Sequence, residues 1–535
     1  MCGITRLLAF RASFMAMLLI TSHAVYAGSV LYVDDDATPG GDGQSWETAY
    51  RFLQDALANA NSFMKIHVAQ GTYRPDRNEA NPQGSGDREA RFHLVNDVAL
   101  QGGYAGIGAD DPDARDIRLY ETLLSGDLLG DDGDDFADND ENSYHVVIGG
   151  NNAAVLSGFT ITAGNANGGQ LPYIGGGMWA GNHTTIDCIF IGNTAGAGGG
   201  YGTLTQSNHS TFLRCNFVEN HATGRGGGVY LDFSGNTATL IDCKFIRNSA
   251  GEIGGGACCY LDASLTLINC DFIGNSAGLA GGGCCNVFSG ASMTLINCRF
   301  VGNTAGQNGG GIGLDIGPLQ VIGCTFHANT AADGNAIAFF KWVANPIYPK
   351  SETVLKNAYF TIANCILRDG GDEFSFPCED NYSITYCNVQ NGWEGEGNID
   401  ADPLFVDPLG PDGIPGTIDD DLRLQPGSPC IDAGDNTALL KGILTDLDGN
   451  PRFVDDPATK DTGFGIPPII DMGAYEYQVK SLCPWDLDGS GSVATGDLLI
   501  LFAQWGTAGH ADFDGDGTVS TSDLLILFAN WGPCL

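Results

Sequence analysis

The chain has 535 residues and carries 64 acidic against 24 basic side chains, for a net charge of −40. Its length predicts two to four domains or one long repeat array, and its apolar content of 43% excludes a disordered chain. The charge excludes nucleic acid as a partner, because that ligand needs a basic surface, and it favours divalent cations.

Residues 1–27 have the pattern of a signal peptide. Arg6 and Arg11 precede an apolar stretch, and a small-residue cleavage site ends at Ala27. The mature chain is therefore expected to be secreted or held at the cell surface. An uncleaved anchor is the alternative, although the apolar run is short for a membrane span. No later segment is apolar enough to cross a membrane, so we expect no transmembrane span in the mature chain.

The start of the mature chain predicts a cap. We expect Ser45 to begin a helix in 45–60, and helical spacing relates four of its residues: Trp46, Tyr50, Leu53 and Leu57. Such a helix would cover the open first coil of a repeat array. Further on, the acidic stretch 126–142 is either a calcium site or a solvated loop, and the sequence leaves both open.

A repeat of 26 to 28 residues occupies the centre of the chain. Each copy has a Cys, a Phe two residues later, an Asn three residues after that, and then a Gly triplet. The cysteines are Cys188, Cys215, Cys243, Cys270, Cys298 and Cys324. Side chains alternate in and out within each copy, as in "TLIDCKF" at 239–245. This pattern predicts a parallel β-helix over 28–400 with an N-terminal cap and regular coils at about 155–340.

Stacked coils place equivalent residues in columns. We expect buried Cys and Phe columns, in which Cys is a small apolar filler, since a zinc site would need clustered Cys and His. We expect the Asn column to bond neighbouring turns and the Gly triplets to form another corner. Four further cysteines fall on adjacent coils. Cys259 and Cys284 should point inward, whereas Cys258 and Cys285 should point outward and could form a disulfide.

Residues 401–478 are rich in Pro, Asp and Gly, which is typical of turns and short strands. We interpret this segment as a module that caps the end of the β-helix. Its acidic stretch 407–421 leaves calcium binding open, as 126–142 does. A linker follows at 478–485.

Two twelve-residue loops, 486–497 and 512–523, match calcium-binding loops. Oxygen-bearing residues occupy positions 1, 3 and 5, glycine occupies 6, a backbone carbonyl serves at 7, and Asp stands at 12 where an ordinary EF-hand has Glu. The candidate Ca²⁺ ligands are Asp486, Asp488, Ser490, Ser492, Asp497, Asp512, Asp514, Asp516, Thr518 and Asp523. A similar helix follows each loop. The second site should be tighter, because Asp516 replaces the Ser490 of the first.

Residues 483–534 resemble the type I dockerin family in their duplicated loop, their Asp at position 12 and the helix after each loop. This resemblance implies a cohesin-like protein partner that binds helix faces and loop positions 10 and 11. Those positions are Thr495 and Gly496, then Thr521 and Ser522, so the first pair departs from the usual Ser/Thr. If the two halves pack with pseudo-twofold symmetry, the ends meet and Cys483 pairs with Cys534.

The larger part resembles right-handed parallel β-helix proteins with the pectin-lyase fold. Residues 401–477, with "DPLFVDP" and "DMGAYEY", look like the choice-of-anchor type C-terminal module. The expected fold class is all-β, a right-handed parallel β-helix solenoid, followed by a small α-helical domain with duplicated calcium loops. The fold family includes polysaccharide lyases and hydrolases as well as non-catalytic surface proteins, so the resemblance does not decide the activity.

No catalytic constellation stands out in the sequence. Outward residues beside the Cys column form either a substrate groove or a solvated sheet face: Asp187, Arg214, Asp242, Lys244, Asp271 and Arg299. Lys341, Trp342 and Lys350 are a second candidate for sugar contact. We expect an exported β-helix protein associated with a polysaccharide or a cell-envelope component. The alternative is a polysaccharide lyase or glycoside hydrolase.

Overall fold

The computed structural model describes residues 28–133, 136–150, 153–168, 173–204, 207–288, 290–315, 317–340, 360–376, 382–478, 483–488, 492–507 and 509–534. The predicted signal peptide, Ser490, Lys341, Trp342 and Lys350 lie outside these residues. The chain divides into two compact units. The first runs to Phe453 and includes Pro457–Glu476, and the second comprises Val454–Asp456 and the chain from Tyr477.

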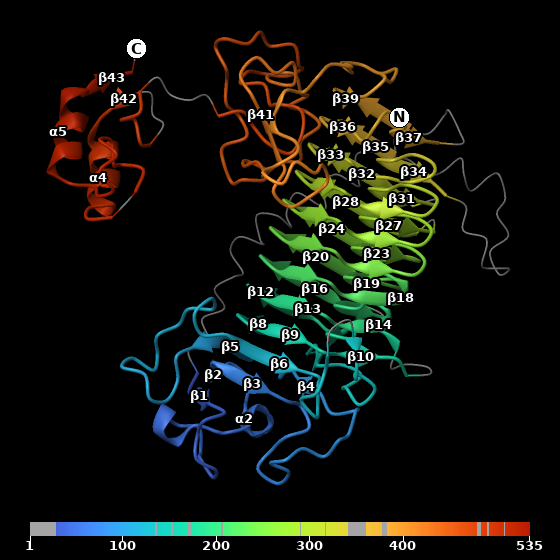
Figure 1. Cartoon of the computed structure of the whole chain (residues 1–535), viewed down its shortest axis with the longest axis vertical. Coiled ribbons are helices and arrows are strands. Elements are labelled where there is room, and N and C mark those ends of the chain that lie inside the picture. The colour runs from blue at the N-terminus through green and yellow to red at the C-terminus, as the bar shows by residue number, and fades with distance from the viewer. Residues whose placement is uncertain are drawn as a thin grey trace, which may run out of the picture. The chain divides into compact units, whose positions relative to one another are not determined.

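The first unit is a parallel β-helix, because its strands pair in parallel with the equivalent strands of the next coil in four sheets (Figure 1). The 12-stranded sheet contains, in order, β1 (Val30–Val33), β2 (Lys65–Ala69), β5 (Ala99–Tyr104), β8 (Ala154–Ser157), β12 (His183–Ile186), β16 (His209–Leu213), β20 (Thr237–Ile241), β24 (Ser264–Ile268), β28 (Ser292–Ile296), β32 (Leu319–Ile322), β35 (Phe360–Ala363) and β38 (Tyr382–Thr385). The 11-stranded sheet contains β3 (Gly71–Tyr73), β6 (Thr122–Ser125), β9 (Thr160–Thr162), β13 (Ile189–Ile191), β17 (Asn216–Val218), β21 (Lys244–Ile246), β25 (Asp271–Ile273), β29 (Arg299–Val301), β33 (Thr325–His327), β36 (Ile366–Arg368) and β39 (Asn388–Val389).

The remaining two sheets complete each coil. The 10-stranded sheet contains β4 (Phe92–His93), β7 (Val147–Ile148), β11 (Met178–Trp179), β15 (Tyr201–Thr203), β19 (Val229–Leu231), β23 (Ala257–Tyr260), β27 (Cys284–Val287), β31 (Ile312–Leu314), β34 (Ile337–Phe339) and β37 (Phe374–Ser375). The 6-stranded sheet contains β10 (Asn165–Ala166), β14 (Thr194–Ala197), β18 (His221–Arg225), β22 (Ser249–Ala250), β26 (Ser276–Ala277) and β30 (Thr304–Ala305). The expected parallel β-helix is therefore confirmed by strand pairing.

The predicted columns of identical residues are present in the core. The six Phe rings of the repeat stack with centroids 4.4 to 5.0 Å apart, and the Phe and Cys side chains of the repeat are fully buried. Burial strongly disfavours the thiolate of Cys188 and raises its pKa to about 12. The Cys column therefore fills space, as predicted.

The Asn column forms a hydrogen-bond ladder along the β-helix. From Asn193 to Asn329, each side-chain Nδ2 donates to the Oδ1 of the next Asn at 2.8 to 3.0 Å. Asn248 Nδ2 also donates to the Phe217 carbonyl at 2.8 Å. At the next corner along the chain, the first glycine of each triplet has φ between 62° and 73°, a conformation that favours glycine. Both corner predictions are confirmed.

The Cys258–Cys285 disulfide hypothesis is wrong. The two residues are register partners on β23 and β27, as expected, but both are free buried thiols. They lie in a second apolar cluster with Tyr230, Tyr260 and Phe288, outside the main core that contains Cys259 and Cys284. Parallel register holds their side chains alongside each other, and this arrangement does not suit the required disulfide geometry.

The N-terminal helix is shorter than predicted. A 3₁₀ turn, η2, covers Trp46–Thr48, and the α-helix, α2, covers only Leu53–Asn59. Ser45 makes no side-chain cap bond, and Phe52 is the N-cap of α2. The helix cannot run through Tyr50, because Tyr50 exchanges backbone hydrogen bonds with the chain at β1. Leu53 and Leu57 still pack against the core of the first coils.

The segment 401–476 lies against the side of the β-helix, where we had expected a cap over its end. Its two short strands, β40 (Phe405–Asp407) and β41 (Asp421–Leu424), are antiparallel. Asn297 Nδ2 donates to the Thr445 carbonyl at 2.8 Å, and the Ala474 N–H donates to Thr325 Oγ1 at 2.9 Å. Trp393 instead packs against the core at the last coil, and its ring centroid lies 5.0 Å from that of Phe374.

The second unit contains two helices, α4 (Thr495–Ala503) and α5 (Thr521–Ala529). A short antiparallel pair connects its first loop to the segment after α5: β42 (Ser492–Val493) and β43 (Gly532–Pro533). Its small core contains Val493, Leu501, Val519 and Leu527. Within the described part of the chain, no helix has the length and apolar character that a membrane span requires.

Candidate functional site

The second predicted calcium loop brings three carboxylates together at its start. Oxygens of Asp512, Asp514 and Asp516 lie within 4.8 Å of one another, which is compatible with shared ligation of one divalent cation. The loop is shaped by its own backbone: the Gly517 N–H donates to Asp512 Oδ2 at 2.8 Å, and the Thr518 N–H donates to Asp516 Oδ1 at 2.8 Å. This geometry fits the oxygen-rich ligand set that Ca²⁺ prefers.

Asp523, at position 12 of the second loop, is buried at the start of α5. Its carboxylate accepts N–H groups from Phe513 at 2.6 Å, Asp514 at 3.2 Å and Ser520 at 2.8 Å. Burial opposes ionisation, but these donors outweigh it and lower the pKa of Asp523. The carboxylate therefore stays charged and ties the beginning of the loop to the helix that follows it.

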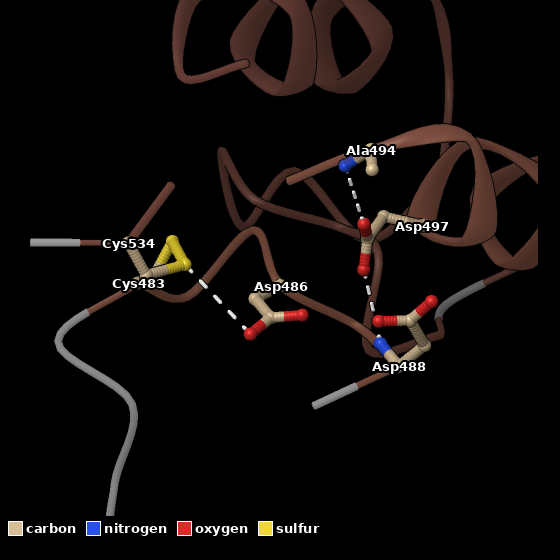
Figure 2. The surroundings of a disulfide bond; sticks show 6 residues. All are labelled: Cys483, Asp486, Asp488, Ala494, Asp497 and Cys534. Atoms are coloured by element: carbon tan, nitrogen blue, oxygen red, sulfur yellow. Dashed lines mark hydrogen bonds between the residues drawn. A yellow bond between two sulfur atoms is a disulfide. The ribbon is translucent and has the colours of Figure 1, made fainter. Parts of the chain in front are cut away.

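The first loop gathers Asp486, Asp488 and Asp497, its positions 1, 3 and 12, whereas the group of the second loop consists of positions 1, 3 and 5 and does not include Asp523. Asp497 Oδ1 accepts the Asp488 N–H at 3.0 Å, and its Oδ2 accepts the Ala494 N–H at 2.7 Å (Figure 2). Its buried carboxylate holds the start of α4, as Asp523 holds the start of α5. Ser492 lies in β42. The sequence thus predicted two acidic groups that the structure assembles, while their occupation by calcium stays a prediction.

The predicted Cys483–Cys534 disulfide is confirmed, with 5.5 Å between the Cα atoms (Figure 2). It joins the two ends of the duplicated unit beside the β42–β43 pair. Cys534 Sγ lies 3.7 Å from Asp486 Oδ2. This is a contact only, because a disulfide sulfur has no proton to donate. The cross-link therefore lies next to the first carboxylate group.

The two halves expose the same apolar residues, in each helix and just after its end, and the sequence reasoning missed them. The exposed side chains are Leu499, Phe502 and Trp505 of the first half and Leu525, Phe528 and Trp531 of the second. Each Phe ring contacts the Trp of its own half, with centroids 5.7 and 5.6 Å apart. The sequence did carry a signal for these residues, because the spacing L-x-x-F-x-x-W occurs after both loops. Large apolar residues that are repeated and exposed are typical of an interaction surface.

Loop position 10 is threonine in both halves, whereas position 11 is Gly496 in the first half and Ser522 in the second. A Cβ atom at Gly496 would clash with Asp488 Oδ2, one of the clustered carboxylate oxygens. In the second half, Ser522 is exposed and its hydroxyl lies 3.0 Å from Ser520 Oγ. A side chain at position 496 would therefore require the Asp488 carboxylate to move, and glycine at this position leaves room for it.

The outward residues beside the Cys column fall into two groups. Arg214 and Asp187 form an exposed ion pair, with 2.7 Å between Nε and Oδ1. Further along, Asp242, Lys244, Asp271 and Arg299 line a cavity of about 420 Å³ against the 401–476 segment. Asp271 and Arg299 are buried there, so the sheet face at this point is not simply solvated.

The two acidic stretches left open by the sequence differ. In 126–142, oxygens of Asp127, Asp132 and Glu141 lie within 4.8 Å of one another. Burial, with the neighbouring charges of Asp127 and Glu141, raises the pKa of Asp132 to about 6. The stretch 407–421 is described throughout, and no such group of three acids lies within it. Its Asp419 and Asp420 line the cavity against the β-helix instead.

Comparisons with known proteins give likenesses of fold only. No family model and no curated protein sequence matches the chain. A solved pectate lyase, Pel9A, is 11% identical, with 84% of this chain and 97% of that chain covered and a TM-score of 0.43. A rhamnogalacturonan lyase is 11% identical, with 73% of this chain and 96% of that chain covered and a TM-score of 0.32. The pectin methylesterase from carrot is 10% identical, with 67% of this chain and 88% of that chain covered and a TM-score of 0.31. At these levels the assignment of a parallel β-helix rests on the strand pairing of the chain itself.

Proposed function

We propose that this chain is an exported β-helix protein that associates with carbohydrate or the cell envelope. Its attachment would occur through a calcium-stabilised, dockerin-like module at 483–534. The observation that carries the proposal is the duplicated loop–helix unit, in which each loop gathers three carboxylates within 4.8 Å and a disulfide closes the ends. Disulfides persist in oxidising compartments, which supports export.

Calcium would act on this module through its charge. The three clustered carboxylates of each loop repel one another, and a bound Ca²⁺ would neutralise that repulsion. Asp497 and Asp523 connect the loops to the first turns of α4 and α5. Calcium binding would therefore stabilise both helices and fix the exposed Leu, Phe and Trp residues that they carry.

These apolar residues are the proposed contact with a protein partner, for which a cohesin-like domain is the candidate. Large apolar side chains exposed in a repeated pattern are typical of interaction sites. Trp and Phe are also enriched at the energetic centres of protein interfaces. The β-helix would provide the carbohydrate-associated part of the molecule. We also propose that the β-helix is right-handed.

The proposal is tested with the full chain on a glycan array and on insoluble neutral and acidic polysaccharides, in calcium and in chelator. Retention on a glycan without cleavage supports a binding role. Appearance of unsaturated or newly reducing ends would instead support the alternative, a polysaccharide lyase or glycoside hydrolase. Absence of retention on any glycan or envelope fraction would contradict the proposed function.

A further inference from the structure

A polar cavity of about 420 Å³ separates the outer face of the β-helix from the 401–476 segment. We call it the lateral groove. The β-helix contributes Asp242, Lys244 and the Asp271–Arg299 pair, and the 401–476 segment contributes Arg423 and Asp448. Its volume falls within the range of about 300–1,000 Å³ that is typical of small-ligand sites. Two distant parts of the chain thus build one site of ligand size.

The wall of the lateral groove is held in place by a buried ion pair. Asp271 and Arg299 are register partners on β25 and β29, and each is only 7% exposed. Arg299 Nε donates to Asp271 Oδ1 at 2.8 Å, and its NH1 donates to the Asp420 carbonyl at 3.0 Å. These polar groups are therefore ordered before any ligand arrives, which reduces the entropy cost of binding.

The charges of the lateral groove select against anionic ligands. Six carboxylates and three cationic side chains line it. Asp271 is paired with Arg299, and Asp421 is paired with Arg423. The remaining carboxylates give the groove an excess of negative charge. A polyuronate carries one carboxylate on every sugar, so it would be repelled here.

The carboxylates of the lateral groove are also too dispersed for a metal site. Among the described residues, the groups of three acids with ligand spacing include both loops of 483–534 but no lining residue of the lateral groove. Carboxylates that are not gathered on one ion can accept hydrogen bonds from hydroxyl groups. Lys244, Arg423 and Asn269 can donate to hydroxyl and ring oxygens from the same walls.

We propose that the lateral groove binds an uncharged, hydroxyl-rich saccharide, and that it discriminates against polyuronates. This inference rests on the proposed carbohydrate association and specifies its site and ligand class. The hydroxyl groups of a neutral sugar both donate and accept, so they match walls that offer acceptors and donors together. No bond is made or broken in this role.

The test measures binding of the full chain to neutral oligosaccharides, namely xylo-, cello- and malto-hexaose, and to hexagalacturonate, by titration calorimetry. The groove variants are Arg423→Ala and Asp448→Asn. Arg214→Ala is the matched control, because the Arg214 side chain is 55% exposed and paired with Asp187, and that of Arg423 is 59% exposed and paired with Asp421. Thermal unfolding of each variant checks that the fold is retained.

We expect at least one neutral hexasaccharide to bind the wild-type chain. We expect each groove variant to weaken that binding about tenfold, as loss of a charge-assisted hydrogen bond does. Arg214→Ala should bind as the wild type does. Preferential binding of hexagalacturonate, or of an amino sugar offered in competition, would overturn the assignment of an uncharged ligand.

Two further results separate this inference from the proposed function. Neutral-sugar binding that is unchanged in both groove variants would place the ligand elsewhere, and the lateral groove would be refuted while carbohydrate association stands. If the wild-type chain binds no glycan in the titrations or on the array, both the groove ligand and the carbohydrate association are contradicted.

Discussion

Asp369 takes the next place in the Asn ladder after Asn329, on the same hydrogen-bond line. Its Oδ1 accepts from Asn329 Nδ2 at 3.0 Å, and its N–H donates to Glu373 Oε1 at 2.9 Å. Both acids are buried, at 6% and 3% exposed. Burial raises the pKa of Asp369 well above its usual range, and the adjacent Glu373 raises it further. Burial and the neighbouring acid therefore favour the protonated form of the Asp369 carboxyl in the folded protein.

This pair predicts a pH-dependent stability. Because folding raises the pKa of Asp369, the stabilisation is complete below the unfolded pKa of about 4 and is lost as the pH rises toward the folded pKa. Asp369→Asn keeps the acceptor for Asn329 and cannot ionise. We expect this variant to gain at least about 1 kcal/mol over the wild type at pH 8, because each unit by which folding raises a pKa is worth about 1.4 kcal/mol, and to gain little at pH 4, as measured by denaturant unfolding. An equal difference at both pH values would contradict the account, and Asp187→Asn, at a partly exposed carboxylate on the outer face, is the control.

Arg452 is a fully buried cation of the 401–476 segment, and its hydrogen-bond and ion-pair partners belong to the same segment. Its Nε lies 3.7 Å from Glu476 Oε2, and its NH2 donates to the Gly473 carbonyl at 2.6 Å. Arg452→Met should lower the free energy of unfolding by about 3–5 kcal/mol, because Glu476 stays buried without this cation. Adding Glu476→Gln should recover a large part of the loss. Failure of that rescue in thermal unfolding would show that the ion pair is not the cause.

At the scale of the element, the Phe column should contribute more to the free energy of unfolding than the Cys column. Phe272 stacks between Phe245 and Phe300, at 4.4 and 4.7 Å. Phe272→Ala should cost about 3–5 kcal/mol through lost burial and the cavity left behind. Cys270→Ala removes one buried atom and should cost about 1 kcal/mol. Denaturant unfolding compares the two, and equal costs would contradict the filler role of Cys270.

The repeated elements were predictable because every position recurs. The period of about 27 residues and the two-residue alternation of "TLIDCKF" placed the Cys, Phe and Asn columns before any coordinates were known. The unrepeated elements were not predictable in this way. Tyr50 pairs with β1 through backbone hydrogen bonds, and this pairing shortens the expected helix. The helical spacing of apolar residues in 45–60 could not reveal a backbone contact with another segment.

At the scale of the molecule, contacts between distant segments limited the prediction of the site. The Arg299 NH1 bond to the Asp420 carbonyl joins residues 121 positions apart. The 401–476 segment has no repeat that marks its partner, so the sequence could not show that Asp271 and Arg299 become buried. The two groups of acids at 483–534 were predictable, because their members fall within twelve residues and the spacing itself brings them together, while calcium binding by them stays a prediction.

The most direct test of the central claim is a calcium titration of the full chain by calorimetry, comparing the wild type with Asp488→Asn plus Asp514→Asn. The account predicts that the wild type binds two calcium ions that the double variant does not bind. It also predicts a tighter second loop, so Asp516→Asn alone should weaken the higher-affinity event about tenfold, while Asp187→Asn, outside both loops, leaves both events unchanged. Calcium binding that is absent in the wild type, or identical in the double variant, would contradict a calcium-stabilised attachment module at 483–534.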